Sequence, residues 1–253
     1  MSRIRREAYG EDIGQHSWVA VDDLRRDIDG LGLSGSSRLL DLGCGPCGPL
    51  TFVMASARCT GTGVELSRAA LRIGRARGAS LGVGARLELV QADLDAPLPF
   101  ASRAFDAAMS LDVVLHVRDR LRLFREIAGL LRPAGRVLFT DAGVVTDSVS
   151  NDEVKRRSVY GFTRFVPPGW NERLLESAGF GLVETLDRTA SVLRNARGRL
   201  AAIQAHRAEL ARVLSAADFE RQREYLETVI ELSKRGALSR VMYLAEVSGN
   251  RLV

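Results

Sequence analysis

A group of glycines near residue 45, together with one carboxylate, has the residue types needed to hold a small ligand. Gly43, Gly45 and Gly48 have the G-x-G-x-x-G spacing of a nucleotide-binding turn, and they follow the apolar segment 38–42. Glycine permits a tight turn and lets the backbone approach a ligand closely, because it has no Cβ. Asp41 stands two residues before the first glycine. The pattern predicts a ligand-binding turn between a strand and a helix.

Asp41 restricts the kind of ligand that such a turn accepts. A dinucleotide site directs a helix N-terminus at a pyrophosphate, and a carboxylate in the turn would repel that group. A ligand without phosphate and with a cationic centre would be attracted instead. S-adenosylmethionine (SAM), with its sulfonium and ammonium groups, has this chemistry.

The first 140 residues alternate between strand and helix patterns. Strands are expected at 38–42, 59–65, 86–91, 105–111 and 136–140, with helices at 49–57, 67–82 and 121–131 between them. This alternation predicts an α/β fold with a parallel, doubly wound sheet. Ligands bind such sheets at the carboxyl ends of the strands. Asp41 and Glu65 lie at the ends of their strands, and Asp93 and Asp112 follow theirs, so the four carboxylates are expected along one edge.

The second half of the chain is richer in helix. A helix is expected at 170–178, a strand at 181–186, a long helical stretch at 195–234 broken near 215–217, and a last strand at 240–247. We interpret 192–237 as a helical lid insertion made of two antiparallel helices, with an oligomerisation hairpin as the alternative. We expect residues 1–253 to form a single domain in which 1–31 is an N-terminal cap segment.

Composition excludes several other classes. Hydrophobic residues make up 46% of the 253, but no apolar run approaches the roughly 20 needed to span a bilayer. The basic start of the chain lacks the apolar segment of a signal peptide, so a cytoplasmic protein without membrane partners is expected. Three cysteines give neither a disulfide framework nor a metal site. The net charge of +5 is dispersed and nearly all from arginine, which argues against a nucleic-acid partner.

The motif Asp41-Leu42-Gly43-Cys44-Gly45, with acids after the following strands, resembles the class I SAM-dependent methyltransferases, in particular their small-molecule, type 11-like branch. The resemblance implies a Rossmann-like sheet, mostly parallel, with an antiparallel last strand. It also implies that Asp41 and the backbone of Gly43 and Gly45 hold the methionine part of the cofactor. One departure is visible: the family commonly has glycine where this chain has Cys47.

The resemblance assigns further cofactor contacts at the ends of the next strands. Glu65, followed by Leu66, would accept from the ribose hydroxyls. Asp93 would accept from the adenine amino group while the Leu94 backbone contacts the ring, and Leu111 would lie against the cofactor. The alternatives are a helix-capping role for Glu65 and a turn role for Asp93.

The segment 9–18 resembles the leader that folds over the cofactor in small-molecule methyltransferases. Gln15 and Trp18 are expected at the cofactor, although Trp18 equally fits the first core position of a helix ending near Leu31. The expected substrate pocket, whose aromatic members also fit an ordinary core, consists of Tyr9, His16, Tyr160, Phe162 and Phe165.

His116 and Asp112 follow the fourth strand, where many members of this family build the reaction face. His116 is a candidate general base, with a structural histidine as the alternative, and Asp112 is a second catalytic candidate. The expected activity is methyl transfer from SAM to an N, O or C atom of a small metabolite, in bacterial specialised metabolism, by a monomer or homodimer.

Two other functions stay open at this stage. An NAD(P)-dependent oxidoreductase fits the glycine spacing but not Asp41, and with only two lysines, Lys155 and Lys234, the chain shows no Tyr/Lys hydride-transfer pair. A SAM-binding module without activity is the other alternative.

Overall fold

The computed structural model describes residues 2–158 and 161–249 and contains a seven-stranded sheet in the order β3-β2-β1-β4-β5-β7-β6. Strands β1 to β5 are parallel, whereas β7 runs antiparallel to both of its neighbours, β5 and β6. The predicted Rossmann-like sheet with an antiparallel last strand is confirmed. The strands are β1 Arg38–Leu42, β2 Thr60–Glu65, β3 Leu87–Gln91, β4 Phe105–Leu111, β5 Leu131–Val145, β6 Phe180–Asp187 and β7 Leu238–Val247.

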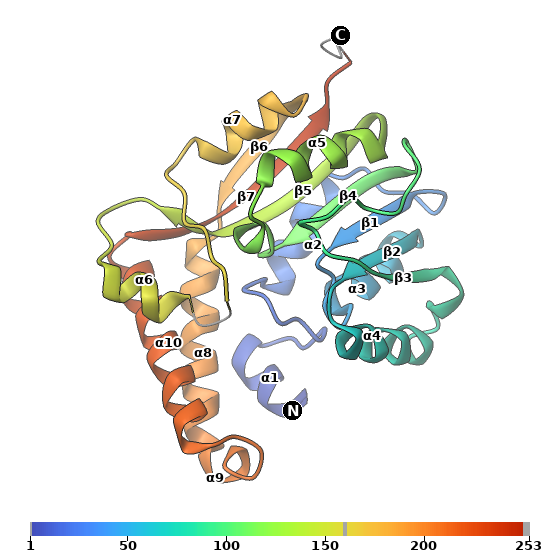
Figure 1. The fold of residues 1–253 in the computed structure, drawn as a ribbon. Coiled ribbons are helices and arrows are strands. Elements are labelled where there is room, and N and C mark those ends of the chain that lie inside the picture. Colours follow the sequence, from blue (N-terminus) through green and yellow to red (C-terminus); the bar gives the residue numbers. More distant parts are fainter. Residues whose placement is uncertain (1, 159–160, 250–253) are drawn as a thin grey trace.

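Helices cover both faces of the sheet and extend beyond one end of it (Figure 1). They are α1 Ser2–Tyr9, α2 Val21–Asp29, α3 Gly48–Ala57, α4 Arg68–Ser80, α5 Arg120–Leu130, α6 Asn151–Arg157, α7 Trp170–Ser177, α8 Thr189–Ala205, α9 Arg207–Leu210 and α10 Ala216–Lys234. Two short 3-10 turns cover Gly84–Arg86 and Val114–His116. The Ser67 side chain caps α4 by accepting from the Ala70 N–H, as its position predicts. No helix in the described part of the chain is long and apolar enough to cross a membrane.

The central strands bury side chains on both faces, which explains their continuous apolar sequences. Leu39 packs with the core formed by α2, α3 and α4, whereas its neighbour Leu40 packs with the core formed by α5 and α7. In β5, Leu138 and Phe139 divide between the same two cores. The period of two in each strand therefore fixes which helices cover which face.

Strand β5 continues five residues past the predicted end at Thr140. The residue after this predicted end, Asp141, is charged. In the structure Asp141 is fully buried and pairs with Arg120 at 2.7 Å. The strand then bulges and goes on pairing with β7 as far as Val145. Because Asp141 is paired with Arg120, the strand can continue past this charged residue while its side chain stays buried.

Helices α1, α8 and α10 form a lobe with its own apolar core beside the sheet (Figure 1). The long helices α8 and α10 lie side by side in the connection from β6 to β7, as the pattern of 195–234 predicts. Helix α1 packs on α8 at Gly198, where a Cβ would lie 2.1 Å from the carbonyl oxygen of Ala8. Glycine at this position is therefore required for the close approach of the two helices.

Candidate functional site

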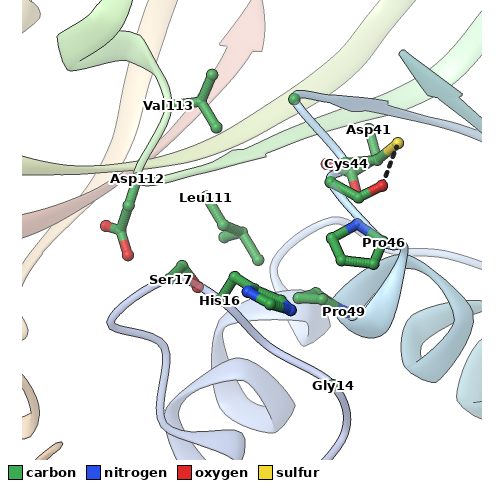
Figure 2. Close-up of a pocket in the computed structure, with 12 residues that line it drawn as sticks. Gly14, His16, Ser17, Asp41, Cys44, Pro46, Pro49, Leu111, Asp112 and Val113 are labelled. Carbon is green, nitrogen blue, oxygen red and sulfur yellow. Dashed lines mark hydrogen bonds between the residues drawn. The ribbon is translucent and has the colours of Figure 1, made fainter. Parts of the chain in front are cut away.

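A cavity of about 180 Å³, here called the turn cavity, lies at the carboxyl ends of β1 and β4. Figure 2 shows the glycine turn with Asp41 and Cys44 on one side and His16 and Ser17 of the N-terminal segment on the other. The turn cavity is lined by Gly14, His16, Ser17, Asp41, Gly43, Cys44, Gly45, Pro46, Pro49, Leu111, Asp112 and Val113. The structure thus brings together the predicted residues Asp41, Gly43, Gly45 and Leu111.

Asp41 presents a carboxylate without a partner to the turn cavity. Its side chain is 3% exposed and makes no hydrogen bond or ion pair with any described residue. Burial, and then the nearby carboxylate of Glu65, raise the pKa of Asp41 from 3.8 to about 8. A buried carboxylate in this state favours a cationic ligand, because such a ligand would supply the missing counter-charge.

The glycine turn adopts the conformation that its sequence predicts, including at the one departure. Gly43 and Gly45 have φ of +78° and +52°. Cys47 stands where the family commonly has glycine, and its φ is also positive, at +60°. The turn therefore keeps a left-handed residue at this position, at the cost of strain in a non-glycine residue. Its buried thiol lies 3.6 Å from that of Cys44.

The N-terminal segment lies directly on this turn. A Cβ on Gly48 would come within 2.5 Å of the Gly14 backbone, so glycine is needed where the two segments meet. Arg77 of α4 joins both, because its guanidinium donates to the carbonyl oxygens of Pro46 and Ile13 at 3.1 and 3.3 Å. Gly14, His16 and Ser17 of the segment 1–31, predicted as a cap, therefore line the turn cavity.

Glu65, Leu66, Asp93 and Leu94 lie at the ends of β2 and β3, outside the lining of the turn cavity. The Glu65 carboxylate accepts from the backbone N–H groups of Gly45 at 3.1 Å and Ser67 at 2.8 Å. Leu66 is 61% exposed. Asp93 is exposed and accepts from the Asp95 N–H, while the Leu94 carbonyl accepts from Arg122. Glu65 therefore contacts the glycine turn, whereas Asp93 and Leu94 form a more exposed continuation of the same edge.

A second cavity of about 450 Å³, here called the lobe cavity, lies between the sheet edge and the helical lobe. It shares His16, Ser17 and Asp112 with the turn cavity, so the two cavities have a common wall. The remaining lining residues are Trp18, Leu115, His116, Ala142, Arg157, Thr163, Arg199, Gln222 and Tyr225. Ligands in the two cavities would therefore lie next to each other.

Asp112 belongs to this common wall, and a buried polar network holds its side chain. Its carboxylate accepts from Arg240 at 2.7 Å, from the Thr140 hydroxyl at 2.8 Å and from the Trp18 N–H at 2.8 Å. Its φ of +59° is unusual for a non-glycine residue. The ion pair with Arg240 occupies this carboxylate, which favours a positioning role, and Asp112 stays a catalytic candidate because it lines both cavities.

Two histidines line the lobe cavity. His116 lies 2.8 Å through Nδ1 from the Phe162 carbonyl oxygen, a contact in which Nδ1–H donates and Nε2 is left as the acceptor. His16 belongs to the common wall. Burial, and then the guanidiniums of Arg5, Arg199 and Arg77, hold the pKa of His16 below its ordinary value. The His16 ring is therefore kept neutral beside the cavity, and the His116 ring is oriented by its contact with Phe162.

Several predicted site residues lie elsewhere. Gln15 is 1% exposed, and its side-chain amide donates to the Glu11 carbonyl oxygen and accepts from the Ile13 N–H. These bonds stabilise the conformation of the N-terminal segment. Trp18 lines the lobe cavity instead of the turn cavity, in keeping with a core position. Tyr9 donates to Ser17 O and faces a different pocket. Phe162 and Phe165 line neither cavity, since Phe162 packs under Arg118 and Phe165 packs against Leu238 and its neighbours; Tyr160 lies outside the described residues.

Sequence reasoning missed the polar residues that the lobe and α6 contribute, namely Arg157, Arg199, Gln222 and Tyr225. Arginine and lysine account for 36 residues of the chain, and no local pattern separates these two arginines from the others. They could not have been singled out without the packing of α6 and α8 beside β5.

The fold and the turn together define a class I methyltransferase architecture, and the comparisons agree with it. Residues 40–139 match the family model described as a methyltransferase domain. Methyltransferase GfsG of Streptomyces halstedii is 32% identical over 163 residues, which cover 62% of this chain and 57% of the relative. Over these residues the chain is similar to SAM-dependent methyltransferases of class I. It spans between 25% and 57% of the length of the first four curated relatives that it matches.

Solved structures show the same fold over nearly the whole chain. Phosphoethanolamine N-methyltransferase 2 of Haemonchus contortus, in complex with S-adenosyl-L-methionine, has a TM-score of 0.83 at 19% identity, covering 98% of this chain and 56% of that one. The [4+2]-cyclase SpnF has a TM-score of 0.76 at 22% identity, covering 96% of this chain and 87% of that one. The fold is therefore shared by proteins named for different reactions.

Proposed function

We propose that the chain binds SAM with its cationic end in the turn cavity and transfers the methyl group to a small metabolite in the lobe cavity. The observation that carries the proposal is the unpartnered, buried carboxylate of Asp41 in a cavity that shares a wall with a second one. Bound SAM supplies a methyl group already activated on its sulfonium. The protein then has to align the acceptor and exclude water.

Residues along the sheet edge would hold the rest of the cofactor. Asp41 would receive the cationic centre, and Gly43, Gly45 and Leu111 would contact it closely. Glu65 remains the proposed partner of the ribose hydroxyls, since it stands beside Gly45. Leu66, Asp93 and Leu94 continue this edge and keep their proposed place beside the adenosine part. Gln15 supports the cap from inside, so we assign it an indirect role.

His116 remains the proposed general base where the acceptor must lose a proton. The Nδ1 contact with Phe162 O orients the ring, and Nε2 is left to accept a proton from a group in the lobe cavity. We leave the acceptor atom as N, O or C, and we keep bacterial specialised metabolism as the expected setting.

The strand order weighs against the oxidoreductase alternative. Dinucleotide-binding sheets have the order 3-2-1-4-5-6, whereas here β7 is inserted antiparallel between β5 and β6. The carboxylate of Asp41 would also face a pyrophosphate unfavourably.

Binding and turnover test the proposal separately. Calorimetry on wild type, Asp41→Ala and the exposed control Asp29→Ala should show SAM binding that only Asp41→Ala abolishes. Incubation with trideuteromethyl-labelled SAM and a metabolite panel should then label a product in wild type. Binding of NAD(P)H without SAM would refute the proposal. SAM binding without transfer to any acceptor would favour the inactive module. Because the label is the methyl group itself, a cyclase-type reaction, which transfers no methyl group, would leave the product unlabelled.

A further inference from the structure

The lobe cavity contains an arginine that differs from the other buried arginines of the described chain. Arg120 and Arg240 are each 1% exposed and pair with Asp141 and Asp112 at 2.7 Å. Arg157 is 5% exposed, but it forms no ion pair with any described carboxylate. Its guanidinium donates only to neutral oxygens, those of the Tyr225 hydroxyl at 3.0 Å and the Ala142 carbonyl at 3.3 Å, and its Nε–H has no partner among described residues.

A second guanidinium, that of Arg199, lines the same cavity without an ion pair among the described residues. It lies 4.7 Å from the Trp18 ring centroid, while Arg157 lies 5.2 Å from that of Tyr225. The two rings are themselves stacked, with centroids 6.0 Å apart. Aromatic faces soften the cost of burying cations, but they do not neutralise them. The carboxylate of Asp112 in the cavity wall is already paired with Arg240.

The lobe cavity therefore has an excess of two positive charges beside an aromatic wall. Burying a charge without a counter-charge is unfavourable, and a ligand that carries the opposite charge would remove this penalty. Guanidiniums suit oxyanions in particular, because several N–H donors lie in one plane.

We propose that the methyl acceptor is an organic oxyanion whose charged group is bound by Arg157 and Arg199 and whose apolar or ring-containing body lies against Trp18 and Tyr225. This inference rests on the proposed function, since it names the class of substrate for the cavity next to the cofactor. Carboxylates and phosphates share the required chemistry.

Three probes of similar size separate charge from shape. Benzoate, phenyl phosphate and neutral benzamide are titrated calorimetrically into the full chain, with and without S-adenosylhomocysteine. We expect at least one of the two anions to bind about tenfold or more tightly than benzamide. The stronger of the two anions indicates whether the group is a carboxylate or a phosphate. Equal binding of all three probes, or binding of neither anion, would overturn the inference.

Variants assign the effect to the two arginines. Arg199→Gln should weaken the preferred anion about tenfold and leave benzamide unchanged, whereas Arg197→Gln, an exposed position on the same helix, should change neither. Arg157→Gln removes the positive charge, whereas Arg157→Lys keeps it and is the milder change. Circular dichroism checks that each variant is folded. Equal losses in Arg199→Gln and Arg197→Gln would contradict the assignment.

The affinity for S-adenosylhomocysteine is the separate measure of the proposed function. If the wild-type protein does not bind S-adenosylhomocysteine, the proposed function is refuted. Intact binding without preference for the anions would refute the oxyanion proposal alone.

Discussion

The Asp112 carboxylate and the Arg240 guanidinium form a buried ion pair, with Oδ1 2.7 Å from Nε and side chains 6% and 1% exposed. Asp112 follows β4, whereas Arg240 lies 128 residues later on β7. The same carboxylate accepts from the Trp18 N–H. One ion pair thus joins a central strand, the antiparallel strand and the N-terminal cap beneath the wall that both cavities share.

Asp112→Asn tests whether this pair is structural. The amide has nearly the same shape but no charge, so Arg240 would be left buried without a counter-charge, and we expect a loss of about 3–5 kcal/mol in urea unfolding. Glu209→Gln, which removes an exposed ion pair with Arg3, should cost less than about 1 kcal/mol. Equal losses in the two variants would contradict the structural role of the pair.

Asp41 should make stability depend on pH in the unliganded protein. Its folded pKa of about 8 lies above the ordinary 3.8, so the folded state retains a proton that the unfolded state releases between these values. The free energy of unfolding therefore does not depend on Asp41 below pH 4 and falls by about 1.4 kcal/mol for each pH unit as the pH rises towards 8. Asp41→Asn should flatten this dependence and raise the melting temperature at pH 8. An unchanged pH profile in this variant would show that Asp41 ionises normally.

SAM binding should release a proton from Asp41 near pH 7. A cationic ligand favours the carboxylate, whereas the unliganded group is mostly protonated below its pKa of about 8. Calorimetry in buffers of different ionisation enthalpy counts the released protons and should give close to one per SAM. A value that stays the same when Asp41 is replaced by Asn would assign the proton to another group.

Glu65→Gln should weaken SAM binding about tenfold or more and leave the fold intact. The carboxylate holds the N–H groups of Gly45 and Ser67, and the amide keeps one acceptor oxygen but loses the charge that strengthens bonds to hydroxyls. Glu88→Gln on the neighbouring strand β3 is the matched control. If stability falls as much as affinity, Glu65 acts by holding the turn together and not by contacting the cofactor.

His116→Ala should lower kcat about 10²- to 10⁴-fold and remove the acid limb of the pH–rate profile, once an acceptor that loses a proton is known. His206→Ala is the control, because that ring bonds Glu7 on the outside of the lobe. The pKa of His16 is held low by burial and nearby guanidiniums. If the acid limb instead lies at low pH and disappears only in His16→Ala, the base is His16.

The sequence by itself determined the sheet, the turn and the charge that the turn presents. Alternating apolar positions at 86–91 placed β3 to within one residue, the segment 105–111 was placed correctly as β4, and Ser67 marked the start of α4. These features depend on neighbouring residues, whose spacing fixes a period or a cap. Asp41 and the glycines likewise belong to one short segment, so their joint placement needed no knowledge of distant contacts.

Tertiary structure alone decided what surrounds that turn. Arg240 pairs with Asp112, and Arg157 of α6 lines the same cavity as Arg199 of α8, only because β7 inserts into the sheet and α8 packs beside it. Each of these arginines is locally indistinguishable from the many others in the chain. Arg157 and Arg240 are particular because they are buried without and with a counter-charge, and Arg199 because it lines the lobe cavity. Both properties result from contacts between segments tens of residues apart.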